Sequence, residues 1–375
     1  MNKCVVTCAV LCVMCDVFIP NVMKLLLKFI SLFYYMAISI RHWMFDCGIL
    51  KSQKFDIPII CVGNITVGGT GKTPVAEMLV AAMSKDYKVA LLSRGYGRRT
   101  SGYLEVKANS SYRDVGDEPL QIKQKFPGVL VVVCERRVEA INKILKSHPE
   151  INLIIMDDGF QHRYVDARIN VVVVDSTRHF DSDSYLPAGT LRDKISALRR
   201  GHYFIVTKCQ EAMSELDQRL WRKDLQKFAF QKVYFSRVAH VTPVSPFESE
   251  LELKEGDKVV AMSGIGNPKA FVDGLKQHYK VVKSFNFSDH HRYTLNDLQM
   301  VAEYLEKHPT LKLISTEKDV VKFRLSRRVP ETIRQKLFYI PMRLEFLEGS
   351  DPDFVKTIRE DLAGKMDFDD LPALK

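Results

Sequence analysis

The residues "VGNITVGGTGKTP" at positions 62–74 have the composition and spacing of a loop that holds phosphate groups. Residues 66–73 match the pattern of a glycine, four residues of any type and then Gly-Lys-Thr, except that Thr66 replaces the first glycine. Glycines let the backbone close around phosphate oxygens, Lys72 is placed to reach the β- and γ-phosphates, and Thr73 to hold Mg²⁺. The alternative is a glycine-rich turn with an incidental lysine. The residues expected to bind the nucleotide are Thr66, Val67, Gly68, Gly69, Thr70, Gly71, Lys72 and Thr73.

A pair of carboxylates follows another apolar run, in "NLIIMDD". Asp157 and Asp158 come where a buried strand should end, and we expect one of them to contact Mg²⁺ directly or through water. The alternative role for two aspartates here is to cap a helix. A guanine-binding Asn-Lys-x-Asp is not apparent, because its nearest equivalent, "TKCQE" at 207–211, lacks both Asn and Asp. The sequence therefore favours ATP over GTP.

Short apolar runs alternate with amphipathic segments over most of the chain. The runs are continuous rather than alternating, as expected of parallel strands buried on both faces, and segments such as 73–84 and 136–147 have a helical pattern. This predicts an α/β fold in which helices flank a parallel sheet, as in phosphate-loop NTPases. The runs predicted as strands of this sheet are 57–64, 88–93, 129–134, 152–158, 170–175 and 203–208.

A second set of apolar runs predicts a smaller α/β domain with strands at 258–264, 279–285, 312–316 and 337–341. The intervening segment 232–255 contains two prolines and little helical period, and is interpreted as a linker. The predicted units are a membrane-associated segment at 1–46, a kinase-like domain at 47–235 and a second domain at 236–375.

Polar clusters at predicted strand ends and in loops contain glycines, prolines and charged residues. Ligands of open α/β sheets bind beyond the carboxyl ends of the strands, so we expect several of these loops to converge on the bound nucleotide. The clusters are "SRGYGRR" (93–99), "VGDEP" (115–119), "DDGFQHR" (157–163), "LPAGTLRD" (186–193) and "SDHHRYT" (288–294).

The first fifty residues are the most apolar part of the chain. Residues 4–15 and 29–40 carry no charge, and each run is shorter than the roughly 20 residues of a membrane-spanning helix. One narrow stripe of polar residues interrupts an otherwise apolar helix, which favours a helix lying at a membrane interface over a spanning or a protein-buried helix. Translation starting at Met23 is a further alternative. The stripe consists of Lys24, Lys28, Ser31, Tyr35, Ser39, His42 and Asp46.

The formal net charge of +10 favours anionic partners such as an acidic membrane surface or a phosphorylated substrate. No aromatic-rich basic groove or known nucleic-acid-binding module is apparent, so no nucleic acid is expected. None of the eight cysteines forms a CxxC pair, which gives a zinc or redox site little support. Cys61, Cys134 and Cys209 lie in or beside apolar runs and are expected to be buried and reduced; Cys4, Cys8, Cys12 and Cys15 recur at helical spacing.

Taken together, the motifs resemble the tetraacyldisaccharide 4′-kinases, the lipid A 4′-kinases of Gram-negative bacteria. The resemblance covers residues 43 to 322 and includes Thr66 in place of the first glycine. It implies an ATP- and Mg²⁺-dependent transfer to the 4′-hydroxyl of a tetraacylated glucosamine disaccharide 1-phosphate, giving lipid IVA in lipid A biosynthesis. It also implies a peripheral location on the cytoplasmic face of the bacterial inner membrane, with no required protein partner. The matching motifs are "FDCGILKS", "VGNITVGGTGKTP", "LSRGYGRR", "VGDEP", "DDGFQH", "LPAGTLRD", "GIGNP", "DHHRY" and "STEKD".

Site residues follow from the same resemblance. Asp117 would be the base that takes the proton of the sugar hydroxyl, and His290 would pair with it across the two domains. Asp193 stands where the family usually has Glu. The residues expected to line the nucleotide or sugar side of the cleft are Gln161, His162, Arg192 and Asp193.

Three other functions are compatible with parts of the sequence. A metallochaperone or GTPase would need metal-binding clusters or a guanine motif. A membrane-associated phosphate-loop NTPase that acts as a switch or assembly factor would hydrolyse ATP without phosphorylating a lipid. A nucleic-acid binder has only the positive charge in its favour.

Overall fold

The computed structural model describes residues 2–239, 241–247, 251–324, 326, 328–347 and 354–364; for residues 2–22 it describes the backbone alone. The predicted roles of Cys4, Cys8, Cys12 and Cys15 as helix-packing side chains therefore lie outside the described residues. Cys61, Cys134 and Cys209 are buried free thiols, as predicted.

The larger of two sheets has a parallel centre with one antiparallel strand at each edge. Apolar side chains fill both faces of the central strands, which explains why their sequences are continuously apolar. The predicted parallel sheet is confirmed. In spatial order its strands are β13 (Leu344–Phe346), β8 (Lys232–Val238), β7 (Tyr203–Thr207), β6 (Ile169–Asp175), β1 (Ile59–Gly63), β5 (Leu153–Asp157), β2 (Val89–Ser93), β4 (Leu130–Val133) and β3 (Leu104–Glu105).

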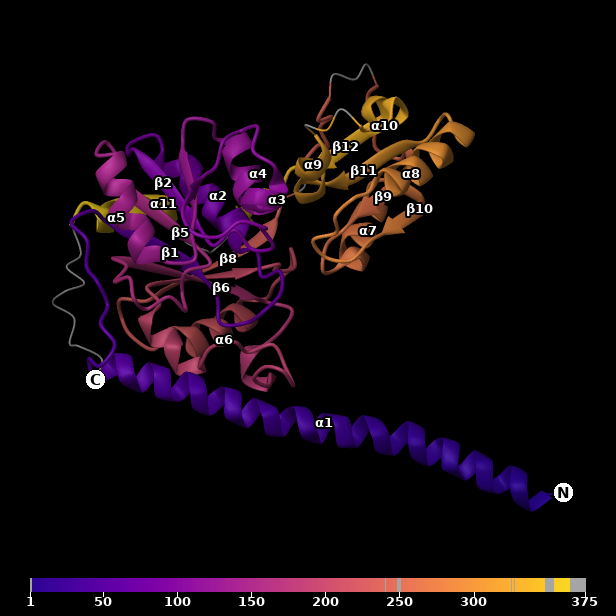
Figure 1. The fold of residues 1–375 in the computed structure, drawn as a ribbon, viewed down its shortest axis with the longest axis horizontal. Helices are drawn as coiled ribbons and strands as arrows, with labels where there is room; N and C mark the ends of the chain where they lie inside the picture. Colours follow the sequence, from indigo (N-terminus) through magenta and orange to yellow (C-terminus); the bar gives the residue numbers. More distant parts are fainter. Residues whose placement is uncertain are drawn as a thin grey trace.

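Helices cover both faces of this sheet (Figure 1). Neighbouring residues of β1 point to opposite sides, so that Ile60 packs with α2 and α11 whereas Cys61 packs with α5 and α6. The helical elements of this layer structure are α2 (Lys72–Met83), α3 (Tyr112–Val115), α4 (Asp117–Lys125), α5 (Arg137–Ser147), α6 (Glu215–Leu225) and α11 (Phe354–Leu362), with short 3₁₀ helices η1 (Phe180–Ser182) and η2 (Ile195–Arg200).

The smaller sheet is parallel throughout and lies beside the larger unit, which it approaches through α9 and α4 (Figure 1). In spatial order its strands are β10 (Lys280–Asn286), β9 (Lys258–Ser263), β11 (Lys312–Thr316) and β12 (Leu337–Ile340). Its helices are α7 (Pro268–Lys276), α8 (Leu295–Lys307), α9 (Glu317–Phe323) and α10 (Glu331–Lys336).

The chain leaves the larger sheet and returns to it. β8 occupies 232–238, within the segment predicted as a linker, so that part of the linker prediction is wrong. β13 then pairs antiparallel with β8, matching Leu344 with Val238, and α11 packs Phe354 and Ile358 into the core beside α2. The expected unit 236–375 therefore needs revision, because its last described part belongs with the larger sheet.

Helix α1 (Asn2–Asp46) is continuous and extends along one side of the body and beyond it (Figure 1). Its stretch Met23–Asp46, of 24 residues, is long and apolar enough to cross a membrane by length and composition. The length of each uncharged run is therefore a poor guide to the length of helix α1, which continues through both runs. Only part of the predicted polar stripe faces water. Ser31 and His42 are buried against the body, whereas Lys24 and Lys28 are exposed.

Candidate active site

The phosphate loop joins β1 to α2, where the backbone turns through two left-handed glycines. Gly68 has φ 97° and Gly71 has φ 88°, a conformation that side-chain-bearing residues resist. Thr70 is fully buried between them: its hydroxyl accepts a hydrogen bond from Asn64 at 2.8 Å, and its carbonyl accepts one from Thr207 at 2.7 Å. The loop is therefore held in shape by buried polar contacts, while Gly69 is exposed.

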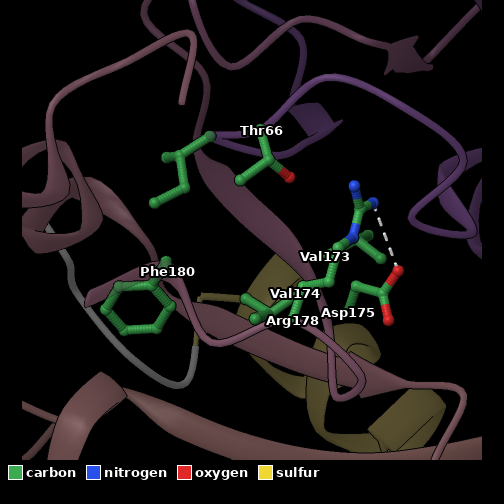
Figure 2. Close-up of a pocket in the computed structure, with 7 residues that line it drawn as sticks. Thr66, Val173, Val174, Asp175, Arg178 and Phe180 are labelled. Atoms are coloured by element: carbon green, nitrogen blue, oxygen red, sulfur yellow. Dashed lines mark hydrogen bonds and ion pairs between the residues drawn. The ribbon is translucent and has the colours of Figure 1, made fainter. Parts of the chain in front are cut away.

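The start of the loop pairs with the segment before Arg192. Val67 donates its N–H to the carbonyl of Thr190 at 2.8 Å, and Thr66 forms an antiparallel bridge with Leu191. Thr66 also lines a small cavity beside Arg178, whose guanidinium is directed to Asp175 at 3.4 Å (Figure 2). This cavity is only about 10 Å³ in volume, large enough for no more than a water molecule. This cavity is therefore too small for a nucleotide.

Lys72 begins α2, and its ammonium lies 3.6 Å from a carboxylate oxygen of Asp158. Asp158 follows β5 with a positive φ of 53° and forms a two-pronged ion pair with Arg192. Burial would raise the pKa of Asp158, but the hydrogen bonds from Arg192 and the charge of Lys72 hold it at about 2. The carboxylate is therefore ionised at neutral pH and keeps Lys72 beside the loop.

Asp157, the last residue of β5, is the residue best suited to a divalent cation. Its side chain is buried, and its Oδ1 atom has no hydrogen-bond partner among the described residues. Burial and the nearby carboxylates of Glu118 and Asp158 raise the pKa of Asp157 to about 7. An unpartnered, electron-rich oxygen in this position fits Mg²⁺, which prefers oxygen ligands, and Thr73 in the first turn of α2 offers a hydroxyl.

Asp117 and His290 meet where the two units approach each other. Nδ1 of His290 lies 2.9 Å from Oδ2 of Asp117, and Nε2 lies 3.0 Å from the ammonium of Lys318. Because an ammonium can only donate, Nε2 accepts in this contact and Nδ1–H donates to Asp117. This contact joins a carboxylate on one unit to an imidazole on the other.

The charges around this pair shift both groups. Burial acts to raise the pKa of Asp117, which is only 5% exposed, yet the hydrogen bond from His290 and the charge of Lys318 leave it below its ordinary value. The hydrogen bond to Asp117 raises the pKa of His290, while burial and Lys318 oppose that rise. Lys322 adds a second ammonium 3.7 Å from Asp117. The aspartate is consequently an ionised, positioned acceptor at neutral pH.

Glu118 links the two groups of residues. Its carboxylate lies 3.5 Å from the ammonium of Lys318 and is close enough to Asp157 to raise the pKa of that residue. The pair Asp117–His290 and the aspartates of β5 therefore belong to one electrostatic region. The link between the two groups runs through the Glu118 carboxylate.

The remaining predicted residues divide into two groups. Gln161 donates to the carbonyl of Asn64 at 2.6 Å and to Asp193 at 3.3 Å, and Arg192 reaches Asp158, so these three lie behind the phosphate loop. His162 instead lines a separate cleft of about 700 Å³, and burial with nearby arginines lowers its pKa to about 4. The structure therefore does not bring His162 to the phosphate loop.

Sequence reasoning missed several residues that the structure places here. All but Lys322 belong to a quoted motif or to the polar stripe of α1, so the available signal was a polar side chain within those patterns. Most of their contacts could not be read from the sequence, because the partner lies far away along the chain; the exceptions are Asn64 with Thr70 and Lys322 with Asp319. The missed residues are His42, Asn64, Glu118, Lys318 and Lys322.

Comparisons with known proteins show which family the chain resembles. The model of the family described as "Tetraacyldisaccharide-1-P 4'-kinase" matches residues 23–363. A tetraacyldisaccharide 4′-kinase of Phocaeicola vulgatus is 37% identical, covering 88% of this chain and 93% of its own. One of Parabacteroides distasonis is 36% identical, with coverages of 89% and 93%. A crystal structure of LpxK from Aquifex aeolicus, described as an "apo" form in complex with ATP, aligns with a TM-score of 0.71 and 25% identity over 91% of this chain and 99% of that one. The chain belongs to the tetraacyldisaccharide-1-P 4′-kinase family.

Proposed function

We propose that this chain transfers the γ-phosphate of ATP to the 4′-hydroxyl of a tetraacylated glucosamine disaccharide 1-phosphate, giving lipid IVA and ADP. The observation that carries the proposal is the convergence of a lysine-tipped phosphate loop with an aspartate–histidine pair in one charged region. Family membership supports the lipid disaccharide as acceptor.

The loop residues Thr66, Val67, Gly68, Gly69, Thr70, Gly71, Lys72 and Thr73 would hold the triphosphate. Backbone N–H groups at the start of α2 and the ammonium of Lys72 would stabilise charge on the phosphates. Thr73, Asp157 and Asp158 would hold Mg²⁺, which when bound neutralises phosphate charge and orients the γ-phosphate.

Asp117 would accept the proton of the 4′-hydroxyl as that oxygen bonds to the γ-phosphorus. The bond between the γ-phosphorus and the β–γ bridging oxygen breaks, its electron pair stays on that oxygen, and ADP leaves. His290 holds the Asp117 carboxylate through its Nδ1–H and stabilises its charge before the proton arrives. Gln161 and Arg192 would hold the phosphate loop and Asp158 in position, with Asp193 behind them. His162 is given no direct role, because among the described residues it lines the other cleft.

We further propose that the protein lies peripherally on the cytoplasmic face of the bacterial inner membrane. One side of α1 is tied to the body by hydrogen bonds, while its other side leaves large apolar residues uncovered. Phe29 is 58% exposed and Trp43 is 57% exposed, and Lys24 and Lys28 are available to anionic lipid. A helix with protein along one side and apolar groups along the other suits the interface better than a crossing.

A transfer assay tests the kinase function. Purified protein, ATP labelled at the γ-phosphate, Mg²⁺ and a tetraacylated disaccharide 1-phosphate should yield a labelled lipid whose label is removed by a phosphatase. Label that appears only as inorganic phosphate would instead favour a nucleotide switch.

A further inference from the structure

Helix α1 is docked onto the loop that carries Arg192 and Asp193. The Ser31 hydroxyl donates to the carbonyl of Tyr185 at 2.8 Å and accepts from the N–H of Ala188 at 3.1 Å. One turn later the Tyr34 hydroxyl donates to the carbonyl of Arg192 at 2.9 Å. The side of α1 opposite its exposed apolar groups is thus fixed to the loop next to the phosphate site.

His42 makes the deepest of these contacts. Its Nδ1 atom lies 2.9 Å from the guanidinium of Arg163, which can only donate, so Nδ1 accepts and Nε2 carries the hydrogen. Nε2 lies 2.5 Å from Oδ1 of Asp193, whose side chain is 3% exposed. His42 therefore donates a charge-assisted hydrogen bond to a buried carboxylate, a strong class of contact.

A short series of hydrogen bonds continues from Asp193 to the phosphate loop. Gln161 donates both to Asp193 and to the carbonyl of Asn64, and the amide of Asn64 donates to Thr70 inside the loop. The backbone N–H groups of Arg192 and Asp193 both donate to Ile65, at 2.8 Å and 3.2 Å. The phosphate loop, Arg192 (which pairs with Asp158) and His42 of α1 are thus joined by hydrogen bonds.

We infer that His42 is a positioning residue of the kinase site: by fixing Asp193 and Gln161, it sets the phosphate loop, so that correct docking of α1 is required for nucleotide binding. The inference rests on the proposed kinase function. It makes α1 part of the framework of the site in addition to its contact with lipid, because opposite sides of the same helix serve the two roles.

Two substitutions at position 42 separate hydrogen bonding from packing. His42→Phe keeps a ring but removes both nitrogens, whereas His42→Gln places an amide N–H near the position of Nε2. Calorimetry on the full chain in detergent, with ATP and Mg²⁺ but no lipid acceptor, should show the Kd for ATP rising about tenfold or more in His42→Phe and recovering to within about threefold in His42→Gln. Cys47→Ser, at an exposed site one residue beyond α1, is the control and should bind like the unsubstituted chain.

Equal affinity of His42→Phe and the unsubstituted chain, with both melting cooperatively, would overturn the inference. If His42→Phe does not fold, Asp193→Asn replaces it, because it weakens the same hydrogen bond at constant size. Because His42→Gln keeps a donor to position 193, Asp193→Asn should raise the Kd about tenfold both alone and in the His42→Gln background, and an unchanged Kd would also overturn the inference. Failure of the unsubstituted chain to label lipid while it binds ATP would reject the proposed function without touching this result.

Discussion

Nδ1 of His290 donates a hydrogen bond to Oδ2 of Asp117 over 2.9 Å, although the two residues are 173 positions apart in the sequence. The histidine comes from the unit built on the smaller sheet, and the aspartate begins α4 on the larger one. Nδ1 faces Asp117, while Nε2 faces the Lys318 ammonium and has the Asp289 carboxylate 4.0 Å away. The position of the smaller unit therefore decides whether this pair exists.

Asp117→Asn and His290→Gln should each lower kcat strongly, and the double variant should be little worse than the more damaged single variant. The reason is that a base and the residue that holds it act as one unit, so that removing either removes the function of both. Steady-state transfer to the lipid acceptor measures this. Losses that multiply would indicate two independent contributions.

Lys318→Met should move the acid limb of the pH–rate profile to higher pH. The hydrogen bond to Asp117 raises the pKa of His290 and Lys318 opposes that rise, so losing the ammonium lets the pKa rise further. His290 then becomes protonated at a higher pH, and the form that donates only through Nδ1 is lost earlier as pH falls. Lys307→Met on α8 serves as the control, because that lysine is exposed. A limb that stays in place or moves down would contradict the assignment.

Lys72→Ala should reduce kcat by about 10²-fold or more, because the ammonium that stabilises charge on the transferred phosphate is lost. Lys85→Ala, which removes an exposed lysine just beyond the end of α2, should leave kcat unchanged. Labelled-ATP transfer assays on the two variants provide the comparison.

Asp157→Asn should stabilise the nucleotide- and metal-free protein at pH 8, and by only about half as much at pH 5.5. The folded pKa of about 7 lies above the ordinary aspartate value, so the native carboxyl binds a proton more tightly than the unfolded one and stability falls as pH rises toward 7. The pKa shift of Asp158 has the opposite sign. Because its folded pKa is about 2, its ionised form stabilises the native state at both pH 8 and pH 5.5. Asp158→Asn should therefore destabilise at both.

Urea unfolding at pH 8 and pH 5.5 measures these four differences. Destabilisation by Asp157→Asn at pH 8 would show that a partner satisfies its buried oxygen.

Replacing Phe29 and Phe33 together by Glu should abolish most binding to vesicles of anionic phospholipid. Both rings are more than half exposed on α1, and burying such a side chain in an apolar phase is worth roughly 1.5–3 kcal/mol. Leu216→Glu changes an exposed leucine on α6 and should leave sedimentation with vesicles unchanged. If the unsubstituted chain, the Phe29/Phe33 double variant and Leu216→Glu bind vesicles equally, α1 does not mediate membrane binding.

The sequence predicted the central strands because burial on both faces leaves a continuous apolar run, as in β5 and β6. It also placed Asp157 and Asp158 at the end of a strand next to the one before the loop, and β5, which pairs with β1, ends at Asp157. β8 was assigned to a linker because prolines follow it, although they lie beyond its end at Val238. The periodic stripe of α1 indicated which side is polar but not what that side faces.

His42 and Lys318 could not be predicted for a related reason. A histidine on a polar stripe and a lysine in a charged motif are ordinary surface residues until a distant carboxylate or imidazole lies against them. Such contacts depend on how whole elements pack, and a single sequence does not encode that pairing in local spacing.

The two chain connections to the smaller unit lie side by side. The chain leaves β8 at Val238 and re-enters the larger sheet at Leu344 of β13, and these two residues pair with each other. A unit joined to the rest of the protein by two adjacent chain segments can rotate about them but stays close to the larger unit. This connection keeps the imidazole near its carboxylate at a high effective concentration, so the contact would re-form readily if the two units separated.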